Sequence, residues 1–130
     1  MNWETVTIKN ESKGRTVPYA SVGFGRLSLS VAACELIKDY DKYDFAELLK
    51  GKINSKSCVG IRLLYKEERT DNSLPLKRRK SGGKIVGGFD IANKPTLEEL
   101  FGPTASASKA TRYNVKKDPD NENILIVFLK

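Results

Sequence analysis

The sequence predicts a mainly β protein with two or three short helices, folded as an antiparallel OB-like barrel or a closely related small β-barrel. Three observations lead to this fold class. Short runs of alternating apolar and polar residues recur along the chain, and each is typical of a strand. The runs follow one another without regular helical crossovers, which favours antiparallel pairing over a parallel α/β sheet. The 130 residues suit one domain over 1–130, with no repeat and no long linker.

The first strands are expected near the N-terminus. Alternation of apolar and polar residues predicts strands over Met1–Lys9 and Val17–Leu29. The second of these contains Gly23 and Gly25, which weaken a strand interior. Such glycines indicate a bulge, a sharp bend or a place where another segment approaches closely.

The middle of the chain combines helical and strand patterns. Ser30–Asp39 has an apolar stripe and serines suited to an N-cap, which predicts a helix. A second short helix is predicted over Tyr43–Leu49, on the spacing of its apolar residues. Cys58–Lys66 alternates most clearly and is expected to be a central strand. Leu74–Leu76 begins a short return whose proline suits an edge strand, because proline has no N–H to donate.

The last third is expected to contain a basic loop, three strands and a short helix. Lys77–Gly83 is predicted to be the loop, and Lys84–Ala92 a strand with two internal glycines. Thr96–Glu99 has the pattern of a capping box that starts a short helix. Thr111–Lys117 and Ile124–Leu129 flank a turn and form the strongest hairpin signal. The last strand is apolar on both faces, which predicts a central position in the sheet.

Composition narrows the functional classes. No run approaches the length of a membrane span, and no basic segment leads into an apolar one as in a secretory signal. We therefore expect no membrane association and a cytoplasmic location. Cys34 and Cys58 are expected to be reduced and partly buried. The chain has no histidine, so histidine-based catalysis is excluded, and two cysteines are too few for a zinc site. We expect no enzyme activity, no cofactor and no metal.

Basic residues point to a polyanionic partner. The net charge is +7 and the sequence pI is about 9.4, which favours polyanions at long range. Lys77–Lys84 concentrates five positive charges in eight residues without an acid, and such side chains can follow a phosphate backbone. Period-two spacing adds two pairs of cations, each pair on one face of a strand. The predicted phosphate-binding residues are Lys77, Arg78, Arg79, Lys80, Lys84, Arg62, Lys66, Arg112 and Lys116.

Aromatic side chains near these charges are candidates for stacking on unpaired bases, a contact that tolerates any base. The candidates are Tyr19, Tyr65, Phe89 and Tyr113, with Trp3 and Phe24 as secondary candidates. Tyr19 and Tyr113 have polar or small neighbours in the sequence. Phe89 follows two glycines that allow another backbone to come near. The remaining phenylalanines Phe45, Phe101 and Phe128 are assigned to the core.

The chain resembles the small single-stranded DNA-binding proteins of phages that infect low-GC Gram-positive bacteria, particularly lactococcal phages. The resemblance lies in its size, its lysine-rich composition, its strand-dominated order and the basic segment Lys77–Lys84. It implies a variant OB barrel and sequence-independent binding of single-stranded DNA during phage replication or recombination, in the host cytoplasm. It also implies a homodimer, for which Leu74–Leu76 offers an edge strand. The chain ends in Ile124–Lys130, without the acidic tail of the usual bacterial single-strand binders.

Two alternatives stay open. Gly25–Leu36 is similar to the strand-then-helix opening of AbrB-type domains, which are swapped dimers that bind duplex DNA and regulate transcription. That resemblance covers about a dozen residues and implies a duplex-binding regulator. The other alternative is a phage protein that inhibits a host protein, with its charge serving only solubility.

Overall fold

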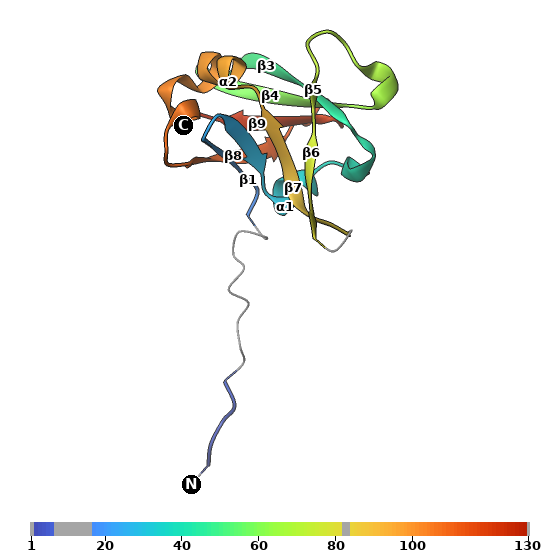
Figure 1. Ribbon diagram of the computed structural model, residues 1–130. Helices are drawn as coiled ribbons and strands as arrows, with labels where there is room; N and C mark the ends of the chain where they lie inside the picture. The colour runs from blue at the N-terminus through green and yellow to red at the C-terminus, as the bar shows by residue number, and fades with distance from the viewer. Residues whose placement is uncertain (1, 7–16, 82–83, 130) are drawn as a thin grey trace.

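The strands form one antiparallel sheet that curves into a nearly closed barrel (Figure 1). The computed structural model describes residues 2–6, 17–81 and 84–129, and within these ranges the side chains of all but 79–81 and 84–87. The sheet order is β5-β3-β4-β9-β8-β1-β2-β7-β6. This architecture confirms the predicted small antiparallel β-barrel. The strands are β1 (Tyr19–Gly23), β2 (Arg26–Leu29), β3 (Phe45–Ile53), β4 (Lys56–Leu64), β5 (Leu74–Pro75), β6 (Lys77–Ser81), β7 (Lys84–Ala92), β8 (Thr111–Lys117) and β9 (Ile124–Phe128).

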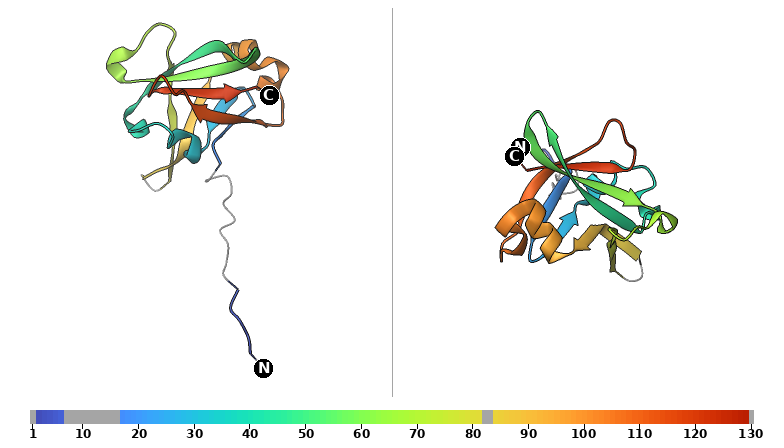
Figure 2. Two further views of the ribbon diagram at one scale, coloured as in Figure 1. Left: turned by 180° about the vertical axis from the view of Figure 1, so that it is seen from behind. Right: turned by 90° about the horizontal axis from the view of Figure 1, so that it is seen from above.

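The barrel closes because both ends of the sheet belong to one stretch of chain. β5 pairs with Phe45 and Ala46 of β3. β6 starts two residues after β5 and pairs with β7 at the other end of the sheet order. Between them, the Leu76 N–H donates to the Asp44 carbonyl at 2.9 Å. The views from behind and from above show the strands around a common interior (Figure 2).

Alternating residues of the strands fill this interior. Six inward residues of β2, β7 and β9 are each no more than 1% exposed: Leu27, Leu29, Phe89, Ile91, Leu125 and Val127. The outward residues between them are half-buried or exposed. β9 lies between β4 and β8, which confirms its predicted central position. The largest fully buried side chains are Phe89, Leu27, Leu29, Ile37, Ile61, Leu63, Ile91, Leu97, Leu125, Val22, Val59 and Val127.

The predicted helix over Tyr43–Leu49 is wrong, because Phe45–Leu49 belong to β3, and Tyr43 and Asp44 lie between the 3-10 helix η2 (Tyr40–Lys42) and this strand. β3 and β4 form a hairpin from the pair Phe45–Leu64 to the pair Ile53–Lys56. Asn54 and Ser55 at its tip have φ of 52° and 68°, the left-handed values that a two-residue turn requires. Long-range pairing with β4 thus overrides the helical spacing of the apolar residues in this short segment.

Two other sequence predictions need correction at their boundaries. The helix predicted over Ser30–Asp39 is α1 (Val31–Cys34), followed by turns and the 3-10 helix η2 (Tyr40–Lys42). Ser30 is the N-cap, as predicted. The chain leaves the α conformation by Asp39, whose φ is 57°. The strand predicted over Met1–Lys9 is absent from residues 2–6, where Trp3 is 85% exposed, and residues 7–9 lie outside the described part of the chain.

The last helix, α2 (Lys94–Phe101), lies at one end of the barrel (Figure 1). It begins earlier than the predicted capping box, because Asn93 is the N-cap and its Oδ1 accepts from the Thr96 N–H at 3.1 Å. It ends at Gly102, whose φ is 74°, and continues into the 3-10 helix η4 (Gly102–Ser106). A further 3-10 turn, η3 (Lys66–Glu68), follows β4. Among the described residues, no helix has both the length and the apolar character needed to cross a membrane.

Two glycines allow close backbone approach. A Cβ on Gly23 would lie 2.8 Å from the Cα of Ala110, and a Cβ on Gly88 would lie 1.8 Å from the carbonyl oxygen of Leu29. No side chain fits at either place. The approaching backbone in each case belongs to this chain, so these glycines serve its own packing.

Candidate nucleic-acid interface

Positive charge is concentrated on one part of the sheet. We call the five consecutive strands β8, β1, β2, β7 and β6 the basic half-barrel. Its only acidic residue is Asp90, whereas it contains Arg26, Lys77, Arg78, Arg79, Lys80, Lys84, Arg112, Lys116 and Lys117. The other four strands contain one acid, Glu47, and the cations Lys50, Lys52, Lys56 and Arg62.

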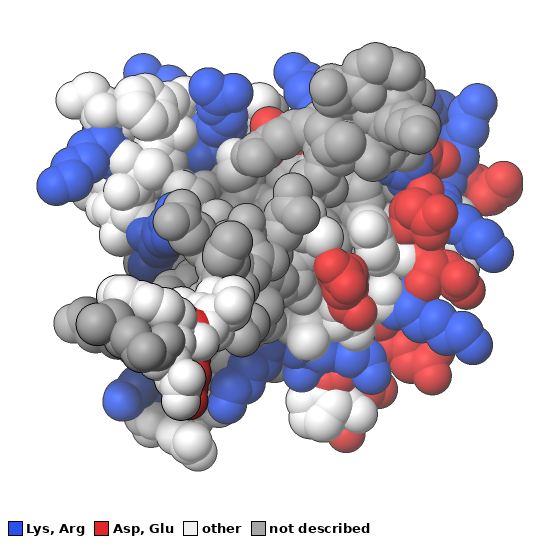
Figure 3. Space-filling model, turned by 90° about the horizontal axis from the view of Figure 1, so that it is seen from below, with Lys and Arg blue, Asp and Glu red and all other residues white. Residues whose placement is uncertain are grey.

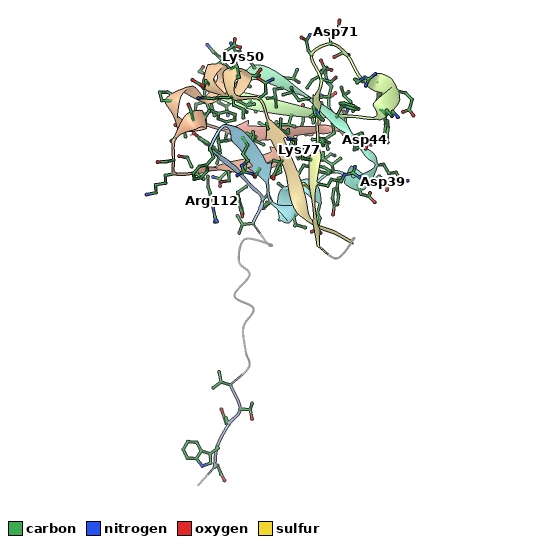
Figure 4. The ribbon with its side chains drawn as sticks, viewed as in Figure 1. Asp39, Asp44, Lys50, Asp71, Lys77 and Arg112 are labelled. Atoms are coloured by element: carbon green, nitrogen blue, oxygen red, sulfur yellow. The ribbon has the colours of Figure 1, made fainter. Side chains whose placement is uncertain are left out.

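The acidic side chains gather elsewhere on the surface. Seen from below, most of the visible ones lie on one side of the barrel (Figure 3). Asp39 and Asp44 lie on that side, and Arg112 lies toward the opposite side (Figure 4). In Figure 3, lysines and arginines are visible on both sides of the barrel, so the two sides differ mainly in their acidic side chains, which repel a polyanion from one side.

Tyr19 and Arg112 form the centre of the candidate interface. On β8, Arg112, Asn114 and Lys116 are exposed, while Val115 between them is buried. This confirms that Arg112 and Lys116 share one face. The register places Asn114 opposite Tyr19 on β1. The guanidinium carbon of Arg112 lies 4.4 Å from the centroid of the Tyr19 ring, within the range of a cation–π contact.

A row of outward residues crosses the basic half-barrel from this pair. The register runs from Arg112 on β8 to Ser21, Ser28, Asp90 and then Lys77 on β6. Four strand spacings of about 4.8 Å place its two cations roughly 19 Å apart. The two serines have short polar side chains, and Asp90 places one negative charge next to Lys77 in this row. Figure 4 shows Arg112 and Lys77 at separate places on this side of the ribbon.

Arg78 has a structural role within the barrel. Its side chain is only 18% exposed. Its Nη2 donates to the Tyr43 carbonyl and lies 3.8 Å from Asp44 Oδ1. Its guanidinium carbon is 5.2 Å from the ring centroid of Phe89. These contacts join β6 to the segment before β3, so Arg78 differs from the exposed Lys77 beside it.

The four aromatic candidates have different surroundings. Phe89 is 1% exposed, so the prediction that it stacks on bases is wrong. Tyr113 packs against Phe101, with ring centroids 5.4 Å apart, and joins the edge of the core. Tyr65 is 39% exposed and stacks on Tyr43 at 4.5 Å. Tyr19 is the one of the four that contacts an exposed arginine of the basic half-barrel.

The Tyr43–Tyr65 pair has an electrostatic consequence. Burial, together with a hydrogen bond to Tyr65, raises the pKa of Tyr43 to about 12. Glu68 accepts from the Tyr65 N–H at 2.9 Å, and the hollow beside the two rings is lined by Lys38, Asp39, Lys117 and Glu122. The two rings cover one face of each other and their surroundings have mixed charge, so this pair differs from the Tyr19–Arg112 pair.

Arg62 and Lys66 do not extend the basic half-barrel. Arg62 lies on β4, 3.8 Å from Glu47 on the neighbouring strand. Lys66 lies in η3, past the end of β4. The prediction that these two cations share one strand face is therefore wrong. The chain turns after Leu64, and strand spacing no longer applies.

The basic segment Lys77–Lys84 is a hairpin rather than a loop. Its first five residues form β6, and Lys84 begins β7. The backbones of Arg79, Lys80 and Lys84 therefore lie in the sheet, next to Lys77 and Arg78. Their side chains lie outside the described part of the structure. The correction follows from the pairing of Lys80 with Ile85 and of Ser81 with Lys84.

Sequence reasoning missed Arg26 as part of this surface. It is exposed on β2, where Leu27 and Leu29 point into the core. The alternation of polar and apolar residues over Arg26–Leu29 could have indicated that Arg26 faces outward. The sequence did not show that β1 and β2 are separate strands joined at Phe24 and Gly25. Lys94 also lies near this turn, since its Cβ is 3.7 Å from an ideal Cβ on Gly25.

Both cysteines are buried, as predicted, and no disulfide joins Cys34 to Cys58. Within the described ranges, no group of three Cys, Asp or Glu side chains is placed to hold a metal ion. No protein-family model, curated protein or solved structure matches the chain. The functional proposal therefore depends on the surface chemistry of the basic half-barrel.

Proposed function

We propose that this protein binds single-stranded DNA with little sequence preference, through the outward face of the basic half-barrel. The observation that carries the proposal is the Tyr19–Arg112 pair, which puts an aromatic ring and a cation together on a surface poor in acids. A single strand offers both unpaired bases and phosphates to such a pair. A duplex offers its phosphates but keeps its base faces stacked.

Each side chain has a distinct part in the proposed contact. Arg112, Lys116 and Lys77 are exposed and neutralise phosphates, with release of counterions. Tyr19 stacks on one base, a contact worth about 1–3 kcal/mol that is available to every base. Arg112 either keeps its contact with the opposite face of the Tyr19 ring or turns to bind a phosphate. Binding of this kind is strong at low salt and largely independent of sequence.

The biological role follows from this binding mode. A sequence-tolerant single-strand binder protects exposed strands during DNA replication or recombination, as the resemblance to phage proteins implies. A homodimer stays a prediction of that resemblance. Leu74 belongs to the segment that suggested dimerisation through an edge strand, and it pairs with Ala46 of β3. A second copy would therefore have to pair with the edge of β5 that faces away from β3.

The test is a fluorescence-anisotropy titration of a labelled 30-nucleotide oligo-dT and of a duplex of equal length, each at 50 and 200 mM salt. The proposal predicts tighter binding to the single strand, with affinity falling steeply as salt rises. Equal or tighter binding to the duplex would favour the transcription-regulator alternative. No binding to either at 50 mM salt would refute a nucleic-acid function and favour a protein partner.

A further inference from the structure

Phe24 at the tip of the β1–β2 hairpin is an unusual residue for its position. Its φ is 56° and that of Gly25 is 76°, so both central residues of the turn are left-handed. Glycine, asparagine and aspartate are the usual residues there, because a larger side chain is strained in this conformation. The Phe24 side chain is also 60% exposed. The ring thus has an unfavourable backbone conformation and little burial to offset it.

The turn that carries this ring is held in place. The Phe24 N–H donates to the Ala107 carbonyl at 3.0 Å, and the Gly25 N–H donates to the Ala105 carbonyl at 2.7 Å. The close contact of Gly23 with Ala110 holds the base of the hairpin. Phe24 is therefore an exposed ring on an anchored turn, and little conformational entropy is lost when a flat ligand stacks on it.

Three exposed cations lie in the segments next to the tip. Arg26 follows the turn and is exposed, and Lys94 lies next to Gly25. The Lys109 carbonyl lies 3.2 Å from an ideal Cβ on Gly23, so the exposed Lys109 belongs to the same end of the hairpin. An exposed ring among three cations fits an anionic ligand with flat faces better than it fits an apolar partner.

The tip is continuous with the Tyr19–Arg112 pair. Tyr19 begins β1 and Phe24 follows its end, so five residue steps place their Cα atoms about 16 Å apart along β1. β8 pairs with the first four residues of β1, Tyr19–Val22, with Arg112 opposite Ser21. We propose that Phe24 is a second base-stacking residue and that a single DNA strand runs along β1 and β8 from Tyr19 to the hairpin tip. This inference rests on the proposed function.

The test replaces Phe24 with asparagine, which adopts left-handed φ more readily. Phe24→Asn is expected to raise the melting temperature and to weaken oligo-dT binding by about 5- to 150-fold, the range of one lost base stack. A higher melting temperature together with a lower affinity would show that the variant lost a DNA contact and that its fold is intact. Phe24→Trp, made in a Trp3→Phe background, is the matched control. It should keep the affinity of that background, and oligo-dT should quench its fluorescence.

The outcomes distinguish this inference from the proposed function. If the wild-type protein does not bind oligo-dT, both fail. If the wild-type binds and Phe24→Asn binds equally well, the inference alone is overturned. If Phe24→Asn loses self-association in sedimentation, or loses binding to anionic phospholipid vesicles, and keeps its DNA affinity, the ring serves a second copy or a membrane surface, and the inference is again overturned.

Discussion

Lys77 and Arg78 are neighbours in the sequence and opposites in the barrel. Lys77 is exposed on the outward face of β6, where it can contact a ligand. Arg78 points the other way and contacts the Tyr43 carbonyl, Asp44 and the Phe89 ring. Lys77 is therefore available to a ligand and Arg78 stabilises the fold, because successive side chains of a strand point to opposite faces.

Replacing each residue should separate stability from binding. Arg78→Ala is expected to lower the free energy of unfolding by about 2–3 kcal/mol, because it removes a half-buried charged hydrogen bond and a cation–π contact. Lys77→Ala is expected to change it by less than about 0.5 kcal/mol and to weaken oligo-dT binding. Urea unfolding and anisotropy measure the two effects. An unfolding free energy that falls equally in both variants would contradict the assigned roles.

At this scale the sequence predicts the types of site residue better than their surroundings. The pairing of Arg112 with Lys116 was predictable, because period-two spacing depends only on local geometry. The burial of Phe89 and the partners of Arg78 were not, since both depend on how β6 and β7 meet α1 and the segment before β3. Tyr19 and Tyr113 look alike in sequence, and only the register of β1 with β8 places Tyr19 on the outward face.

At the scale of elements, one serine hydroxyl ties a helix to a strand. Ser30 Oγ accepts from the Ala33 N–H at 3.1 Å, which caps α1, and from the Tyr19 N–H at 3.0 Å. Ser30 is 8% exposed, so water cannot easily replace these bonds. The hydroxyl thereby helps to fix the start of β1, the strand that carries the proposed stacking residue.

Ser30→Ala should destabilise the protein by about 2 kcal/mol, because it removes an N-cap and leaves a second N–H without its acceptor. Ser28→Ala is the matched control, since Ser28 lies on the outward face of β2 and is half-buried. Its expected effect is within about 0.5 kcal/mol. Thermal unfolding followed by circular dichroism measures both. A Ser30→Ala melting temperature equal to that of the wild type would show that the cap is unimportant.

The β3–β4 hairpin shows where element prediction fails. Phe45, Leu48 and Leu49 have helical spacing, and the sequence alone could not show that nine cross-strand pairs form with β4. The strands predicted over Cys58–Lys66, Lys84–Ala92 and the C-terminal pair are found with small boundary shifts. Those segments have strict alternation or strong flanking turns, so local sequence was sufficient.

The tip of the β3–β4 hairpin, at Asn54 and Ser55, offers a stabilising substitution. Ser55 has φ of 68°, and the second central residue of such turns is preferably glycine. Ser55→Gly should therefore raise the free energy of unfolding by about 1 kcal/mol. Ser57→Gly, two residues later in β4, should lower it by roughly 0.5–1 kcal/mol, since glycine weakens a strand interior. Destabilisation by Ser55→Gly in urea unfolding would contradict the turn geometry.

At the scale of the whole molecule, barrel closure and charge segregation act together. The segment from β5 to β6 joins both ends of the sheet. Closure fixes which strands are neighbours and so brings the backbones of five cation-rich strands together in one part of the sheet. A net charge of +7 was evident from composition. Its placement depends on sheet order, which the sequence does not specify by local pattern.

The central claim is that binding depends on this placement, and a charge-matched pair of variants tests it most directly. Arg112→Gln with Lys116→Gln removes two charges from the basic half-barrel. Lys52→Gln with Lys56→Gln removes two exposed charges from the β3–β4 hairpin. The measurement is the affinity for oligo-dT as a function of salt.

We expect the first variant to lose at least about tenfold in affinity. We also expect its slope of log affinity against log salt concentration to be smaller by about 1.4, the value for two phosphate contacts. We expect the second to stay close to the wild type. Equal losses in both would contradict the claim, because binding would then follow net charge wherever it lies.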